Sequence, residues 1–179
     1  MPARPRLYPT ADDFKEVDSF KTKAYLCIAP ASLWFTKQLP ERQWISLIRA
    51  IPPEFRVMLL GSQQDHGLSE RIMKESGSER CMNLAGRLSL LQSAALMQDA
   101  VMNYVNDSSP MHLASAVNAR TTAVFCSTVP QFGFGPLSDH AVVVESTEKL
   151  TGPSSVISVP KSKEPFARPE SSVICFPSS

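Results

Sequence analysis

The sequence predicts an α/β fold, a Rossmann-like parallel sheet with helices on both faces. Apolar runs of four to six residues recur along the chain, as expected for the buried strands of a parallel sheet. Segments with apolar residues at helical spacing alternate with these runs, which is the pattern of βαβ units. Gly or Pro separates most neighbouring segments. Because βαβ crossovers are right-handed, the units build one sheet layer covered on two sides.

The first strand and the first helix of this layer follow from the positions of prolines. Residues 25–29 are apolar and stop at Pro30, which indicates a short buried strand. Pro40 suits the first turn of a helix. Apolar side chains then recur at helical spacing, at Trp44, Leu47, Ile48 and Ile51. We therefore expect a helix over residues 41–51, which the following Pro-Pro pair ends.

Glycines mark the limits of the next elements. Residues 56–60 contain four consecutive apolar residues after Arg56 and are closed by Gly61, which predicts a second strand. A helix is expected over residues 68–75, with Gly77 as its stop. Residues 81–84 are mostly apolar and precede Gly86, and they predict a brief third strand.

The remaining elements continue the alternation. Ser89 is suited to cap an amphipathic helix over residues 89–99. A strand is expected over residues 101–105 and a helix over residues 110–117. Two further strands are predicted, at residues 121–126, where two threonines precede four apolar residues, and at the apolar residues 141–144. Residues 24–150 thus form one predicted domain.

The two ends of the chain differ from this domain in composition. Residues 1–23 are polar and contain proline, and we interpret them as a leading segment. Residues 151–179 are rich in Pro, Ser and Lys and show no clear periodicity. That composition predicts a disordered or atypical tail.

Composition excludes several classes of function. The chain has 18 basic and 17 acidic residues and a net charge of +1, so no long-range field favours nucleic acid. No signal peptide is visible, and no apolar run approaches the ~20 residues of a spanning helix. We expect a cytoplasmic protein with peripheral membrane contact at most. Its four cysteines lack CxxC pairing and are interpreted as buried, reduced thiols.

The sharpest candidate site follows the predicted strand at residues 101–105. There Asp107, Ser108 and Ser109 precede Pro110 at the start of a helix. Free N–H groups at a helix start suit a phosphate, and a carboxylate beside them can accept bonds from sugar hydroxyls. The alternative is an ordinary N-cap that binds nothing.

His112 lies four residues after Ser108, so both can share a helix face. A Ser-His-Asp triad is nevertheless disfavoured, because three groups on one turn seldom place the histidine between the other two. The alternative is a half-buried histidine that bonds a backbone carbonyl.

Two more predicted strand ends carry polar residues, and parallel strands bind ligands at their carboxyl ends. Lys37 follows the first strand and can serve as a point charge for a phosphate, or it can be a solvated loop lysine. Asp65 follows the second strand and can bind a ribose diol, or it can cap a helix. No Cys/His cluster has the spacing of metal ligands, so neither metal nor other cofactor is expected.

Five segments in order resemble the C-terminal domain of glycosyltransferase family 9, the heptosyltransferases of lipopolysaccharide synthesis. The likeness covers roughly residues 24–145, and residues 125–136 resemble the family's closing segment. The matching segments read Ile-Ala-Pro-Ala-Ser at residues 28–32, Thr-Lys-Gln-Leu-Pro at 36–40 with Trp44, Leu-Leu-Gly-Ser at 59–62, Asn-Leu-Ala-Gly at 83–86, and Asn-Asp-Ser-Ser-Pro-Met-His-Leu-Ala at 106–114. The resemblance implies one half of a two-domain GT-B enzyme, whose donor, typically ADP-heptose, binds mainly to this domain.

Carried over by position, the resemblance implies roles for the first half of the site. Lys37 matches a lysine that approaches the donor diphosphate, and Ser32 matches a small or hydroxyl residue near the phosphates. Asp65 matches an acidic position that holds the adenosine ribose. Leu88 matches a position whose backbone contacts the adenine.

The same resemblance implies roles for the last matching segment. Asp107 matches an aspartate near the donor sugar. Ser108 and Ser109 match residues whose N–H groups cradle the phosphate, and His112 matches the histidine of that motif. Many family members have Gly where this chain has Ser109. Its Cβ can crowd the diphosphate, or its hydroxyl can donate a bond.

The resemblance also implies a part that residues 1–179 do not supply. The family's catalytic base is an acidic residue of the N-terminal domain. Residues 1–23 are too short to form such a domain. We therefore expect no catalytic residue in this chain, and a lipid-linked saccharide acceptor bound through a missing N-terminal half. The alternatives are a non-catalytic nucleotide-binding module and an inactive remnant.

Overall fold

Six parallel strands form the centre of the computed structural model, which describes residues 4–126, 135–145, 156–159 and 172–175. The strands are β1 (Tyr25–Ala29), β2 (Arg56–Leu59), β3 (Cys81–Asn83), β4 (Met102–Asn106), β5 (Thr121–Phe125) and β6 (Ala141–Glu145). Their order across the sheet is β3-β2-β1-β4-β5-β6, and every neighbouring pair is parallel. This arrangement confirms the predicted Rossmann-like fold.

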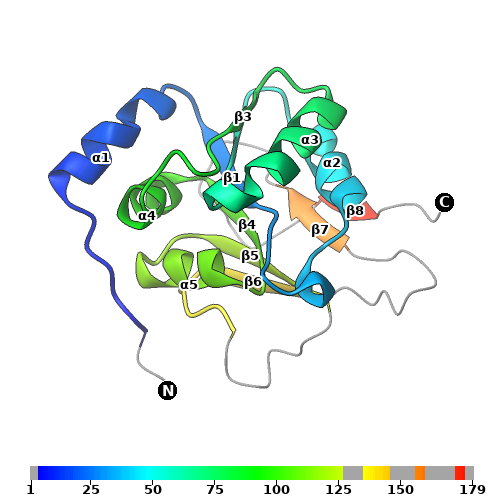
Figure 1. The fold of residues 1–179 in the computed structure, drawn as a ribbon. Coiled ribbons are helices and arrows are strands. Elements are labelled where there is room, and N and C mark those ends of the chain that lie inside the picture. Colours follow the sequence, from blue (N-terminus) through cyan, green and yellow to red (C-terminus); the bar gives the residue numbers. More distant parts are fainter. Residues whose placement is uncertain (1–3, 127–134, 146–155, 160–171, 176–179) are drawn as a thin grey trace.

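Helices connect the strands on both faces of the sheet (Figure 1). They are α1 (Ala11–Val17), α2 (Glu41–Ala50), α3 (His66–Ser76), α4 (Leu90–Asp99) and α5 (Ser109–Ala116), with 3₁₀ turns η1 (Asp18–Phe20), η2 (Phe35–Lys37) and η3 (Gln63–Asp65). Within the described ranges, no helix has the length and apolar character needed to cross a membrane.

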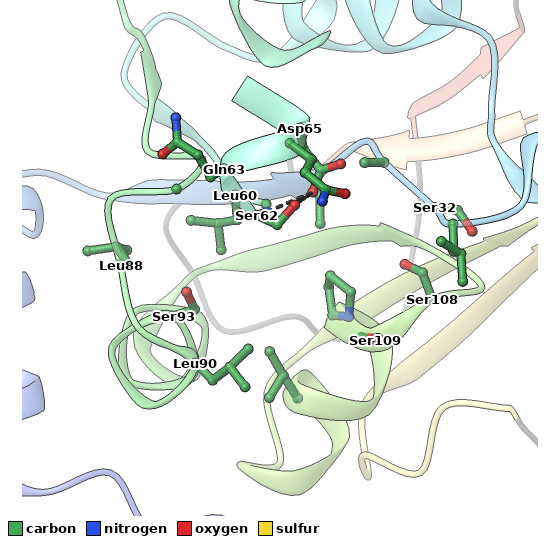
Figure 2. Close-up of a pocket in the computed structure, with 18 of the residues that line it drawn as sticks. Ser32, Leu60, Ser62, Gln63, Asp65, Leu88, Leu90, Ser93, Ser108 and Ser109 are labelled. Carbon is green, nitrogen blue, oxygen red and sulfur yellow. Dashed lines mark hydrogen bonds between the residues drawn. The ribbon is translucent and has the colours of Figure 1, made fainter. Parts of the chain in front are cut away.

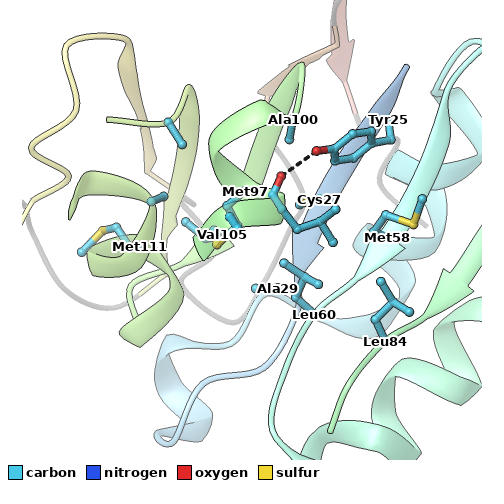
Figure 3. Close-up of a cluster of buried hydrophobic side chains, with 14 of the residues drawn as sticks. Tyr25, Cys27, Ala29, Met58, Leu60, Leu84, Met97, Ala100, Val105 and Met111 are labelled. Atoms are coloured by element: carbon cyan, nitrogen blue, oxygen red, sulfur yellow. Dashed lines mark hydrogen bonds between the residues drawn. The ribbon is translucent and has the colours of Figure 1, made fainter. Parts of the chain in front are cut away.

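The alternation of side chains along β1 separates two apolar layers. Leu26 and Ile28 face the layer that contains Trp44 of α2 and Ile72 of α3. Tyr25, Cys27 and Ala29 face the opposite layer, which receives side chains from α1, α4 and α5. Figure 3 shows this second layer, where the hydroxyl of Tyr25 donates to the carbonyl of Leu96 at 2.8 Å. Because β1 is buried on both faces, it is apolar throughout.

The predicted helix ends were confirmed where a capping side chain or a glycine marks the end of the helix in the sequence. Ser89 caps α4, and its hydroxyl accepts from the N–H of Gln92 at 3.1 Å. Gly77 ends α3 in the left-handed conformation, with φ of 66°. The predicted strands begin and end within one residue of the observed ones.

The ends of the chain contain more regular structure than the sequence analysis expected. Helix α1 lies within the leading segment, held by a capping box between Thr10 and Asp13, and it packs against α4. Strands β7 (Val156–Val159) and β8 (Ser172–Cys175) pair antiparallel inside the predicted tail. Both strands lie within residues 151–179, for which a disordered or atypical tail was predicted. The rest of residues 151–179 lies outside the described residues.

Candidate functional site

The carboxyl ends of four neighbouring strands surround a pocket of about 750 Å³. Its walls come from the segments that follow β1, β2, β3 and β4, and from one side of α4. Figure 2 shows Asp65 and Ser62 on one side of it, Leu88 and Leu90 on a second, and Ser32, Ser108 and Ser109 on a third. The pocket thus lies at the edge of the sheet where open parallel folds bind ligands.

Asp65 contributes to the pocket wall while also fixing the turn that contains it. Its Oδ2 accepts from both the N–H and the hydroxyl of Ser62, each at 2.7 Å, in a capping box around η3. Asp65 also occupies the N-cap position of α3, but its side chain makes no cap hydrogen bond to that helix, so the carboxylate stabilises the preceding turn instead. Because Asp65 also lines the pocket, the cap holds a carboxylate at the mouth of the site.

Close backbone packing joins the segments after β2 and β3. Gly86 has a φ of 79°, and its N–H donates to the carbonyl of Gly61 at 2.9 Å. A Cβ on Gly86 would lie 2.7 Å from the Cα of Gln63, so the two segments approach too closely for a side chain. Asn83 holds the same region, since its amide donates to the carbonyl of His66 and its Oδ1 accepts from the N–H of Ala85.

Asn106, at the end of β4, clamps the segment that follows β1. Its Oδ1 accepts from the N–H of Leu39 at 3.1 Å, and its Nδ2 donates to the carbonyl of Pro30 at 2.7 Å. The side chain is fully buried, so both of its hydrogen bonds form away from water. The clamp fixes both ends of the loop that contains Ser32 and Lys37.

Lys37 and Asp107 form an ion pair next to this clamp. The Nζ of Lys37 lies 2.6 Å from Oδ2 of Asp107, and the Asp107 side chain is 8% exposed. Neither residue is among those that line the pocket, although Asp107 directly precedes the lining residue Ser108. The cation and the carboxylate, for which separate roles were expected, thus contact each other.

Helix α5 begins at the pocket without a side-chain cap. Ser108 is its N-cap in extended conformation, and the Ser108 hydroxyl donates to the carbonyl of Asn106 at 3.3 Å rather than accepting from the helix. Ser109, the first helical residue, is exposed and lines the pocket. His112 is exposed and does not line the pocket, so the half-buried histidine considered above is wrong.

The pocket combines hydroxyl groups with an apolar wall. Serines line much of its polar surface, and Leu88, Leu90, Met97 and Leu113 supply apolar surface. Of the described residues that line it, Asp65 alone carries charge. The described part of the chain also holds no group of three His, Cys, Asp or Glu residues arranged to bind a metal. The surface therefore suits a ligand with an apolar ring and hydroxyl groups.

Five of the eight site residues expected from sequence lie together in the pocket wall: Ser32, Asp65, Leu88, Ser108 and Ser109. Asn106, Gln63 and Ser93 contribute to the site although the sequence alone indicated no role for them. A polar residue at the end of a fully buried strand was the available signal for Asn106. Gln63 and Ser93 had no such signal, because only folding brings them to the pocket. Residues 127–134, within the family-like closing segment, lie outside the described residues.

Comparison with known protein families assigns most of the chain to one family. Residues 4–159 match the family model for glycosyltransferase family 9 (heptosyltransferase). Two similar curated proteins are lipooligosaccharide heptosyltransferase 2 of Haemophilus influenzae, 36% identical over 97 residues, and lipopolysaccharide heptosyltransferase 2 of Escherichia coli, 32% identical over 119 residues. These matches cover 52% and 64% of this chain but 28% and 32% of the relatives. The chain thus spans about a third of the length of the curated relatives it matches.

Solved structures of related proteins share the fold. The E. coli ADP-heptose lipopolysaccharide heptosyltransferase II is 26% identical with a TM-score of 0.67, covering 78% of this chain and 44% of that one. A glycosyl transferase family 9 protein from Veillonella parvula is 17% identical with a TM-score of 0.73, covering 82% of this chain and 44% of that one. The second likeness concerns the fold alone.

Proposed function

Because this chain belongs to glycosyltransferase family 9, we propose that residues 24–150 are the domain of a heptosyltransferase-like enzyme that binds the nucleotide-diphosphate sugar. ADP-heptose is the proposed donor, and a lipid-linked saccharide of lipopolysaccharide or another cell-surface glycan is the proposed acceptor. The names of the relatives support this choice, since they are lipopolysaccharide and lipooligosaccharide heptosyltransferases. The similar E. coli structure is that of an ADP-heptose lipopolysaccharide heptosyltransferase.

One observation carries the proposal. A single pocket at the carboxyl edge of the sheet is lined by residues that were assigned separately to the phosphates, to the ribose and to the adenine of the donor. In the proposed complex, the apolar wall beside Leu88 receives the adenine, and Asp65 accepts hydrogen bonds from the ribose hydroxyls. The start of α5 at Ser108 and Ser109 receives the diphosphate, because helix N-termini offer free N–H groups and a positive dipole end.

Lys37 is proposed to act on the leaving group. Its ammonium pairs with Asp107, one residue before the N-cap of α5, so it lies beside the proposed diphosphate site. As the bond between sugar and diphosphate breaks, negative charge grows on the diphosphate. A cation and helix N–H groups held in place stabilise that charge.

A general base for the acceptor is proposed to come from a second Rossmann-like domain, as the family resemblance implies. Two carboxylates near the pocket are already engaged, since Asp65 caps η3 and Asp107 pairs with Lys37. Loss of a positioned base typically slows such a reaction about 10²–10⁴-fold. Residues 1–179 alone are therefore expected to bind donor without transferring sugar at a meaningful rate.

Titration calorimetry with ADP, UDP and GDP tests the donor assignment. We expect ADP to bind, and to bind more tightly than UDP and GDP. Binding of none of the three would overturn the proposed function. Preference for UDP or GDP would overturn ADP-heptose as donor and retain a nucleotide-sugar site.

A transfer assay distinguishes this proposal from a non-catalytic nucleotide-binding module. ADP-heptose and a lipid A–core acceptor are incubated with this chain alone, and then with the N-terminal half of a family member added. Turnover only in the mixture supports a divided enzyme. Turnover by the chain alone would contradict the need for a second domain, and turnover in neither case favours the module or an inactive remnant.

A further inference from the structure

The lysine beside the proposed diphosphate site already holds a carboxylate. The Nζ of Lys37 lies 2.6 Å from Oδ2 of Asp107, and the residue after Asp107 is Ser108, the N-cap of α5. Ser32, from the same loop as Lys37, and Ser108 lie on one side of the pocket (Figure 2), whereas Lys37 and Asp107 do not line it. The ammonium therefore stands next to the pocket while its charge is directed to a group outside the pocket wall.

The pocket wall itself offers little positive charge to a diphosphate. Of the described residues that line it, Asp65 alone carries charge, and that charge is negative. The start of α5 contributes N–H groups and a dipole equivalent to about half an elementary charge. A diphosphate carries more negative charge than one helix end balances. We therefore expect a bound diphosphate to attract the ammonium of Lys37.

The side chain of Lys37 can turn, whereas its backbone and its partner are held. The N–H of Lys37 donates to the carbonyl of Trp34 at 2.9 Å, and Asn106 clamps the loop on both sides. The N–H of Asp107 donates to the carbonyl of Val124 at 3.1 Å, and the Asp107 side chain is 8% exposed. The lysine side chain is 27% exposed and has a flexible four-carbon stem. In any rearrangement the ammonium moves and the carboxylate stays.

We propose that Asp107 competes with the diphosphate for Lys37, so that binding of a nucleoside diphosphate exchanges the carboxylate partner of the lysine for a phosphate oxygen. The inference rests on the proposed function and adds to it a limit on affinity. Binding gives up the attraction between Lys37 and Asp107, and it brings a second anion close to the carboxylate. Both effects weaken the complex. Return of the lysine to Asp107 favours release of the diphosphate once the sugar has left.

A second arrangement keeps the ion pair closed. An ammonium has three donors, so Lys37 can in principle bind Asp107 and a phosphate oxygen together. In that arrangement Asp107 positions the lysine, and removal of its charge weakens the binding of ADP. Lys37 does not line the pocket while it is paired with Asp107, which favours the exchange. The two arrangements predict opposite effects of the same substitution.

Asp107→Asn removes the charge and keeps the shape of the side chain. Calorimetry at fixed ionic strength measures ADP and adenosine binding to the unchanged chain and to this variant. We expect ADP to bind about five- to tenfold more tightly to the variant. Adenosine should bind equally to both, because it has no phosphate to compete for the lysine. Equal adenosine binding also shows that the pocket of the variant is intact.

Glu41→Gln is the charge-matched control. It removes a carboxylate that pairs with Arg71 on the surface, 2.8 Å from that guanidinium, and Glu41 does not line the pocket. This variant should bind ADP like the unchanged chain. A gain equal to that of Asp107→Asn would show a general effect of net charge and would overturn the proposal.

The gain in affinity should depend on the lysine. In a Lys37→Ala background, Asp107→Asn can relieve only the repulsion between carboxylate and diphosphate, so the gain should be clearly smaller than in the unchanged background. An equal or larger gain without the lysine would mean that Asp107 acts by repulsion alone. Asp107→Ser, also uncharged, repeats the measurement if the asparagine variant does not fold.

The outcomes separate this inference from the proposed function. Equal or weaker ADP binding by Asp107→Asn, with adenosine binding unchanged, would overturn the competition and leave the nucleotide site in place. Absence of ADP binding in every variant, all folded by circular dichroism, would overturn the proposed function and the inference with it.

Discussion

The Nζ of Lys37 lies 2.6 Å from Oδ2 of Asp107, and this contact ties the loop after β1 to the end of β4. Asp107 is 8% exposed and Lys37 is 27% exposed, so the carboxylate is the more deeply buried partner. The pair keeps the lysine beside the start of α5. The same ion pair thus contributes to stability and sets the position of the cation proposed to act on the diphosphate.

Removing the lysine should destabilise the protein more than neutralising the aspartate. Lys37→Ala removes the cation 2.6 Å from a carboxylate that is 8% exposed, and it is expected to lower the free energy of unfolding by about 1–3 kcal/mol. Asp107→Asn should lower it less, because a partly exposed lysine can turn toward water. Denaturant unfolding of both variants and of the double variant measures this. Independent, additive losses in the double variant would contradict a direct pair.

The Asn106 clamp should affect both stability and ligand binding. Asn106→Ala leaves the N–H of Leu39 and the carbonyl of Pro30 without partners, and we expect a loss of about 2–4 kcal/mol in unfolding free energy. ADP affinity should also fall, because the clamped loop contains Ser32 and Lys37. Thermal melting and calorimetry check the two effects.

Asn103 offers a matched control on the same strand. It is also fully buried, and its amide donates to the carbonyls of Met97 and Arg120, away from the loop after β1. Asn103→Ala should destabilise the fold without a specific loss of ADP affinity in the folded protein. Equal losses of affinity in both variants would show that the clamp has no particular role at the site.

The close approach at Gly86 should make alanine there more harmful than at Gly77. A Cβ on Gly86 would lie 2.7 Å from the Cα of Gln63, whereas a Cβ on Gly77 meets nothing within 4 Å. Both glycines have positive φ, so backbone strain of roughly 1 kcal/mol is common to the two substitutions. The difference between their melting temperatures therefore reports the steric clash. Similar melting temperatures would mean that the two segments separate easily.

Burial of Cys81 should make stability fall at alkaline pH. Burial raises the pKa of its thiol from 9.0 to about 12, with the charge of Arg80 opposing part of the effect. Because the folded pKa is above the unfolded one, this contribution is fully present below pH 9 and is lost as pH rises toward 12. Unfolding free energies at pH 7 and pH 10 should differ less for Cys81→Ala than for the unchanged chain. An equal pH dependence would contradict the prediction.

Most of the fold followed from short-range patterns. Strand β1 was predictable because five apolar residues stop at a proline, and α3 because Gly77 ends it in a conformation that favours glycine. Helix α1 was missed because Val17 is its only buried residue, so it lacks a clear apolar period. The Thr10–Asp13 capping box was nevertheless present in the sequence as a signal.

Which residues line the pocket was easier to predict from the sequence than which of them contact each other. Ser32, Asp65 and Ser108 were predicted from their positions after strands and by resemblance, and they line the pocket. The pairing of Lys37 with Asp107 was not predictable, because it depends on how closely the loop after β1 folds against β4.

The most direct test of the account is calorimetry of ADP and adenosine binding to the unchanged chain and to Lys37→Ala, below the melting temperature of both. Lys74→Ala, which removes a lysine on α3 that does not line the pocket, is the charge-matched control. We predict that Lys37→Ala weakens ADP binding by about 1.5–3 kcal/mol, the usual contribution of a charge-assisted hydrogen bond, and leaves adenosine binding unchanged. Equal ADP affinity in the unchanged chain and Lys37→Ala would contradict the proposed diphosphate site.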